Sequence, residues 1–197
     1  MGEQDTDSVF GRSFALLFLK ELAIADLKTP FLTDATFAEL LSLSCESLAK
    51  ERDLRGFVAL KGWAHQTAHA ADLLKALARN PRLLTEQART IANAVVERAR
   101  ASNTAWSWGE DARLGAVLAT LASRGDVSIV LFENWTTTLL AENKELWRGA
   151  FDVKKYRQVQ AQSSLVAQMA ALLTARPATP TIATVSKLLA KTIVLLQ

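Results

Sequence analysis

Apolar residues recur every three or four positions along almost the whole chain, which is the spacing of amphipathic α-helices. The strong helix formers Ala, Leu, Glu, Lys, Arg and Gln dominate. Alternating Val-rich runs flanked by turn residues, which would indicate strands, are not present in the sequence. The pattern predicts eight helices, at about 9–27, 34–50, 55–79, 85–101, 110–123, 126–146, 152–175 and 181–195.

Prolines and glycines mark the predicted breaks. Pro30 and Pro81 push the residues before them out of the helical region, and Gly125 is suited to end a helix. Because several connections are short, successive helices should be antiparallel. Four hairpins at a spacing of about 40–50 residues are typical of a HEAT-like α-α solenoid. The sequence shows no clean repeat, so a closed helical bundle is the alternative.

The length, composition and net charge of the chain indicate one domain and exclude few functions. A length of 197 residues, half of them hydrophobic and 22% charged, predicts a single all-helical domain over 1–197. The net charge of +3, with basic and acidic residues interleaved, does not favour nucleic acid. A single cysteine, Cys45, excludes an intrachain disulfide and fits a cytoplasmic location. No apolar run reaches the roughly 18 residues that a membrane span needs.

The segment around both histidines carries the sharpest chemical signal. His65 and His69 are four residues apart, and Asp72 follows three residues later. On a helix these positions fall within an arc of roughly 60°. The neighbouring residues are small, so a ligand or another helix can approach. A buried polar network, a metal site and a proton-transfer site are three interpretations that the residues leave open.

The metal interpretation would use His65, His69 and Asp72 as ligands of a divalent ion. Asp72 could instead accept a hydrogen bond that fixes an imidazole tautomer. Helical zinc proteases place a glutamate after the first histidine, whereas this chain has Gln66, which cannot act as a base. Gly62 is expected inside the same helix, at a cost of about 1 kcal/mol relative to alanine.

Two further polar segments surround this one in the sequence. Glu110 and Asp111 open a predicted helix, where carboxylates suit the positive end of the dipole. Alternatively, one of them faces the histidines beside a wall of Trp106 and Trp108. The segment 51–56 is expected to form salt bridges. The candidate binding residues are Trp63, His65, His69, Asp72, Glu110, Asp111 and Arg113.

These segments together resemble a known bacterial family, the domain of unknown function 2785. The resemblance runs from about residue 5 to at least residue 140, and its most specific part is the tryptophan–histidine–histidine–aspartate block. The segments that carry it are Val9–Phe14, Asp53–Gly56, Lys61–His65, Ala68–Leu74, Gly109–Asp111 and Arg113–Leu114. It implies an all-helical, solenoid-like cytosolic protein and no particular activity. Members usually have helical sequence before the segment equivalent to Asp7–Phe14, so this chain is expected to represent a shorter form.

The expected function is that of a binding or scaffold module that contacts a partner protein or a small molecule. The alternative is a metal-dependent enzyme or metal-binding protein centred on His65, His69 and Asp72. No cofactor is required by the first interpretation, and we favour it over an enzymatic role.

Overall fold

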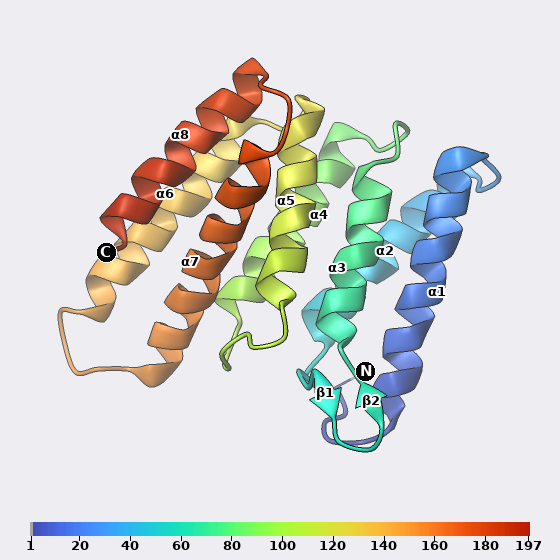
Figure 1. Ribbon diagram of the computed structural model, residues 1–197, viewed down its shortest axis with the longest axis horizontal. Helices are drawn as coiled ribbons and strands as arrows, with labels where there is room; N and C mark the ends of the chain where they lie inside the picture. Colours follow the sequence, from blue (N-terminus) through green and yellow to red (C-terminus); the bar gives the residue numbers. More distant parts are fainter. Residues whose placement is uncertain (1) are drawn as a thin grey trace.

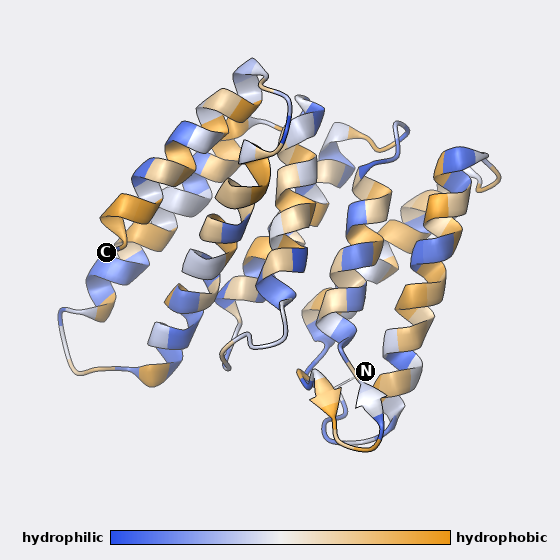
Figure 2. Cartoon of the chain, in the orientation of Figure 1, coloured by the Kyte–Doolittle hydropathy of each residue, from blue (hydrophilic) through white to orange (hydrophobic). Residues whose placement is uncertain are grey.

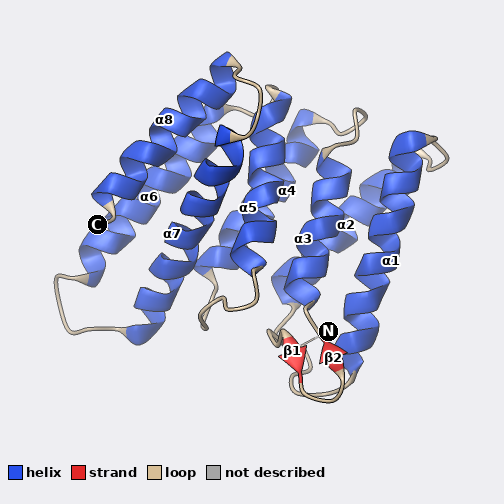
Figure 3. Cartoon of the chain, viewed as in Figure 1, coloured by secondary structure: helices blue, strands red, loops and turns tan. Residues whose placement is uncertain are grey.

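The computed structural model describes residues 2–197 and confirms the all-α prediction (Figure 1). Seven predicted helices agree with the observed bounds to within three residues. The helices are α1 Ser8–Lys28, α2 Asp34–Lys50, α3 Gln66–Ala78, α4 Thr85–Arg100, α5 Glu110–Arg124, α6 Ile129–Leu146, α7 Val153–Thr174 and α8 Pro180–Leu195. The two short strands, β1 Phe57–Val58 and β2 Gly62–Trp63, form an antiparallel hairpin (Figure 3).

The prediction of a helix over 55–79 is wrong for its first half. Residues 51–65 form a loop and the β1–β2 hairpin, and α3 begins only at Gln66. Leu60, Gly62 and His65 have positive φ angles of 66°, 93° and 44°, which a right-handed helix cannot contain. Gly62 therefore supplies a turn, and the expectation that it lies inside a helix is also wrong.

The helices form two rows. In one row α1 contacts α3, α3 contacts α5, and α5 contacts α7. Helices α2, α4 and α6 lie behind this row in Figure 1, while α8 packs against α6 and α7. Because α1 and α8 lie at opposite ends of the long axis, the hairpins are stacked in a line and do not close into a bundle (Figure 1).

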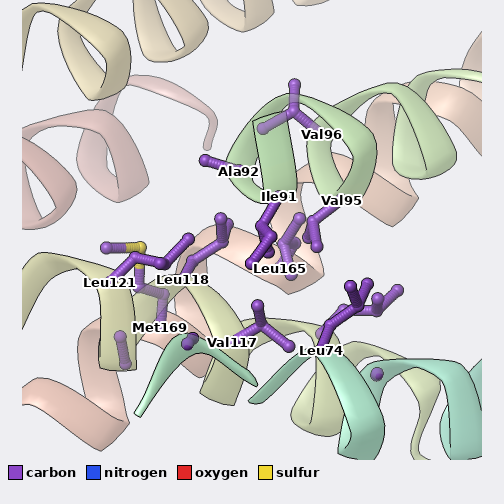
Figure 4. Packing of buried hydrophobic residues seen from close by; sticks show 14 of the residues in the cluster. Leu74, Ile91, Ala92, Val95, Val96, Val117, Leu118, Leu121, Leu165 and Met169 are labelled. Carbon is purple, nitrogen blue, oxygen red and sulfur yellow. The ribbon is translucent and has the colours of Figure 1, made fainter. Parts of the chain in front are cut away.

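The apolar core runs between the two rows (Figure 4). Leu74, Ile91 and Leu118 are fully buried there, and they come from α3, α4 and α5. Gly115 allows α5 to approach α7 closely, because an added Cβ would lie 2.9 Å from the side chain of Gln168. Polar and apolar residues alternate along the outer helices in Figure 2. No helix within residues 2–197 combines the length and the apolar character needed to cross a membrane.

The loops that surround the candidate site lie together at one end of the molecule. The N-terminal segment, the β1–β2 hairpin and the α4–α5 connection all lie at the same end of the helices (Figure 1). In the row formed by α1, α3, α5 and α7, the N-terminal parts of α3 and α5 lie side by side at this end. Residues distant in sequence therefore meet at the start of α3.

Candidate functional site

The loop that leads into the hairpin is fixed by charged groups, and one of them joins it to α1. Both oxygens of Glu51 accept from Arg12, with Nε–Oε2 at 2.7 Å and Nη2–Oε1 at 3.0 Å. Asp53 pairs with Arg55 in the same way. Burial works to raise the pKa of Asp53, but the hydrogen bonds and charge of Arg55 outweigh it and lower the pKa. The expected salt bridges of segment 51–56 are thus present, and they hold the loop that leads into the site.

His65 is the first fixed point of the site. It is the N-cap residue of α3 in a left-handed conformation, and its carbonyl accepts from His69 N at 3.1 Å. The side chain is almost fully buried, and Nε2 lies 2.9 Å from the carbonyl oxygen of Trp108. Because a carbonyl only accepts, Nε2 of His65 carries the proton and donates. His65 therefore joins the start of α3 to the loop before α5.

Trp108 is held on its other side by Glu110. The backbone N–H of Trp108 donates to Oε2 of Glu110 at 2.9 Å, and Glu110 is buried at the first turn of α5. The indole ring lies over Gly56, where an added Cβ would be 2.1 Å from Cγ of Trp108. Glycine at position 56 is therefore what lets Trp108 pack against the hairpin.

His69 is anchored to α1. Its Nδ1 lies 2.7 Å from Oγ of Ser13 and 3.2 Å from the carbonyl oxygen of the same residue. A proton on Nδ1 satisfies both contacts, since the carbonyl can only accept. Phe14 places its ring edge-to-face with the imidazole at a centroid distance of 6.3 Å. Ser13 and Phe14 thus belong to the site although they are more than 50 positions away in sequence.

Asp72 completes the polar group but does not face a histidine as a hydrogen-bond partner. It forms ion pairs with Arg113 and, at 3.6 Å, with Lys75. The Arg113 pair joins α3 to α5. Asp111 points elsewhere and accepts from Ser164 of α7. Of the two carboxylates at the start of α5, Glu110 reaches the site through the backbone of Trp108, whereas Asp111 bonds to α7.

The two imidazoles are close to each other, with ring centroids 5.9 Å apart. Burial lowers the pKa of His65, and the charge of Glu110 only partly opposes this effect. Burial also lowers the pKa of His69, despite the hydrogen bond to Ser13. Both rings are therefore neutral near pH 7. The tautomers above leave Nδ1 of His65 and Nε2 of His69 unprotonated, and neither accepts a hydrogen bond from the described residues.

The metal interpretation lacks a ligand set in this geometry. Among residues 2–197, no three His, Cys, Asp or Glu side chains are grouped so that they could hold a metal ion. The reason is that Asp72 turns toward Arg113 and Lys75, and one nitrogen of each histidine is already bonded to α1 or to Trp108.

An aromatic surface lies over His65. We call Phe57, Trp63, His65 and Trp108 the Trp63 cluster. Trp63 stacks on His65 at 5.0 Å and meets Phe57 and Trp108 edge-to-face at 5.5 and 5.7 Å. The exposed fractions of Phe57, Trp63 and Trp108 are 50%, 47% and 44%. Each of these residues is thus about half exposed, and each ring also packs against another aromatic ring.

The sequence signals found some of these residues and missed others. Trp63, His65, His69, Asp72, Glu110 and Arg113 do lie around the start of α3 and α5. Phe57, Ser13 and the carbonyl of Trp108 were not predicted. Ser13 and Phe14 lie in a segment that carries the family resemblance, which was the available signal for them. The role of the Trp108 carbonyl could not be predicted, because every residue has a backbone carbonyl whatever its side chain.

The fold and the site define a class: an all-helical protein of stacked antiparallel hairpins with an aromatic and histidine-lined surface at one end. The chain belongs to the family described as "Protein of unknown function (DUF2785)", whose family model matches residues 1–166. The match confirms the resemblance seen in the sequence and includes the whole Trp63 cluster. A search of curated proteins and a search of solved structures gave no match.

Proposed function

We propose that this protein is a binding module and that the Trp63 cluster is its ligand-contacting surface. The observation that carries the proposal is the set of three half-exposed aromatic residues in which Phe57 and Trp108 pack against Trp63, and Trp63 stacks on buried His65. Exposed apolar groups that gather in one patch mark interaction sites, and tryptophans dominate the energy of such contacts. The stacked helices act as a rigid scaffold for the patch.

The chemistry of the patch suggests what it would bind. Trp63 and Trp108 offer ring faces and edges for a planar or apolar group. The unprotonated nitrogen of His69, which is only partly buried, can accept a hydrogen bond from an N–H or O–H group. Arg113 is neutralised by Asp72, so a strongly charged ligand gains little. We therefore infer a ligand that combines a flat apolar group with a hydrogen-bond donor, on a small molecule or on a protein side chain.

Two finer assignments accompany this proposal. We propose that the hairpins are HEAT-like repeats, which the two rows of helices and the short connections support. We also propose a cytoplasmic location, supported by the single cysteine, Cys45. Its thiol is buried, and burial raises its pKa to about 11, which keeps it protonated and unreactive.

The test is a ligand-observed NMR screen of planar heteroaromatic fragments that carry N–H donors, with short tryptophan- or tyrosine-containing peptides as a second set. Fragments or peptides that bind the wild type should no longer give a binding signal with the variants Trp63→Leu and Trp108→Leu. Trp147→Leu is the matched control, since Trp147 is 63% exposed but lies outside the cluster. Binders that persist in both cluster variants, or the lack of any binder to the wild type, would refute the proposal.

A further inference from the structure

A buried arginine outside the Trp63 cluster has an unusual hydrogen-bond environment. Arg98, near the end of α4, is only 6% exposed. Its Nη1 donates to the carbonyl oxygen of Glu51 at 3.2 Å. Within residues 2–197, its Nε and Nη2 have no hydrogen-bond partner, and no carboxylate forms an ion pair with it. A buried charge with unsatisfied donors is costly, so this arrangement needs an explanation.

The unsatisfied donors are the pair that arginine uses to grip an anion. Nε–H and Nη2–H lie along one edge of the guanidinium and match two oxygens of a carboxylate or phosphate. The neighbouring arginines show this use: Arg12 binds both oxygens of Glu51, and Arg55 binds both oxygens of Asp53, through the same two nitrogens. The Nε–Nη2 edge of Arg98 has no carboxylate partner in the described part of the chain.

Arg98 also lines a pocket of about 940 Å³, which it shares with Lys50, Arg52 and Asn103. This is at the upper end of the roughly 300–1,000 Å³ of small-molecule sites. None of the lining residues belongs to the Trp63 cluster.

The two acidic residues of this pocket, Glu3 and Glu51, both lie against Arg12 and have hydrogen-bond donors of their own. Glu51 accepts from Arg12 and from the backbone N–H groups of residues 52 and 53. Glu3 accepts from Ser8 and lies 3.6 Å from Arg12. Lys50 pairs with Glu46 at the surface. The side chain of Arg52 is exposed and makes no ion pair with the described residues, so the net field of the pocket favours an anion.

We propose that this pocket binds a small molecule through an oxyanion, a phosphate or a carboxylate, which the Nε–Nη2 edge of Arg98 grips with two hydrogen bonds. Arg52 contributes charge at the pocket surface, and the Asn103 amide can contact the rest of the ligand. The two donors are themselves buried, so binding requires the lining of the pocket to move and uncover them. The N-terminal residues Gly2–Gln4 form one wall and are held to the opposite side by the bond from Gln4 to the carbonyl of Arg52.

Isothermal titration calorimetry on the full chain tests this proposal, with inorganic phosphate, adenosine monophosphate, acetate and citrate as probes. The wild type should bind at least one of them. Arg98→Met keeps the length and apolar body of the side chain and should weaken that binding at least about tenfold, as expected for lost hydrogen bonds to a charged group. Arg52→Gln should weaken it less, and Arg148→Gln, an exposed arginine outside the pocket, should not change it.

Arg98→Lys guards against a folding defect in the methionine variant. It keeps the charge but loses the two-pronged edge, so it should fold and still bind more weakly than the wild type. Binding of both phosphates but not of the carboxylates would assign the group as phosphate, and the reverse would assign a carboxylate. The proposal is overturned if the wild type binds none of the four probes, or if Arg98→Met and Arg98→Lys bind as tightly as the wild type.

Discussion

Two aromatic groups on this protein differ in how they are held. The Trp63 cluster joins the β1–β2 hairpin and the α4–α5 loop, and it is anchored by the hydrogen bond from His65 to Trp108. The second group, which we call the Trp147 cluster, consists of Trp147, Phe151 and Tyr156, with ring centroids 5.5–6.4 Å apart. It runs from the end of α6 through the α6–α7 connection to Tyr156 in the first turn of α7. Among the described residues, none of its three side chains makes a hydrogen bond.

Exposure alone does not separate the two clusters. Trp147 and Phe151 are 63% and 60% exposed, which is more than Trp63 and Trp108. The difference is preorganisation: a hydrogen bond and a buried histidine join two separate segments of chain in the Trp63 cluster, whereas in the Trp147 cluster only Tyr156 packs against the core and no side chain makes a hydrogen bond within residues 2–197. A binding surface that is already ordered loses less entropy on binding. This is why we assign the ligand site to the Trp63 cluster.

The largest effect is expected from filling the space beneath Trp108. In Gly56→Ala, the new Cβ would lie 2.1 Å from the indole, so Trp108 must move off the hairpin. We expect a loss of about 1–3 kcal/mol in the free energy of unfolding, typical of an overpacked site. Chemical denaturation followed by tryptophan fluorescence measures both the loss and the greater exposure of the ring.

Gly11→Ala is the matched control for that variant. An added Cβ there meets nothing within 4 Å, and the position lies in α1. It should stabilise the protein by up to about 1 kcal/mol through better helix propensity. Equal stability of the two alanine variants would show that Trp108 is not held against the hairpin.

The next effect concerns pH and the two histidines. Burial lowers the pKa of both, so the unfolded chain binds protons more readily than the folded one. Their contribution to stability is therefore complete above the unfolded value of about 6.5 and is lost as pH falls through the lowered folded pKa values. We expect the melting temperature of the wild type to fall between about pH 6.5 and 5, and to fall less in His69→Ala.

The same melts should be repeated with a chelator, which is expected to change nothing. A wild type that gains stability toward acid relative to His69→Ala would contradict the neutral-histidine account. A melting temperature lowered by chelator at the alkaline end would restore the metal interpretation.

A smaller effect is expected from the ion pair beside the cluster. Asp72→Asn removes the charge that pairs with Arg113 and Lys75. The Arg113 side chain is 43% exposed, so solvent screens the pair. We expect a loss of no more than about 1 kcal/mol, measured from the urea midpoint. A loss above about 2 kcal/mol would make this ion pair, rather than the His65 hydrogen bond, the main anchor of the site.

The smallest effect is expected at the Trp147 cluster. Trp147→Leu should change the free energy of unfolding by no more than about 0.5 kcal/mol, as for most exposed positions. It should also leave the NMR signals of Trp63 and Trp108 in place. Shifts of those signals would show that the two clusters are coupled, and the comparison between them would fail.

Most of the fold could be predicted because its determinants are local. Apolar periodicity and prolines such as Pro30 and Pro81 set the helix bounds without reference to distant residues. The segment 55–65 could not be predicted in the same way. Leu60 and His65 adopt left-handed backbone conformations that their side chains do not signal, and only the glycines at 56 and 62 indicated a break.

Most members of the candidate site could be predicted, apart from Ser13 and Phe57, but the hydrogen bonds that connect them could not. The two histidines are close although His65 lies outside α3. His65 is the N-cap residue of this helix, and its carbonyl accepts a hydrogen bond from the backbone N–H of His69, so the helical spacing extends back to it. The bond from His65 to the Trp108 carbonyl spans 43 positions and depends on how α3 and α5 pack. Arg98 was not singled out, because an unpaired buried arginine can be recognised only once its surroundings are known.

The central claim is that the Trp63 cluster is ordered before any ligand binds. The most direct measurement is ¹⁵N relaxation of the indole N–H groups in the free protein, assigned with single Trp→Leu variants. The account predicts order parameters near about 0.85 for Trp63 and Trp108 and a value below about 0.6 for Trp147. Equal values for the three indoles, or lower values for Trp63 and Trp108 than for Trp147, would contradict it.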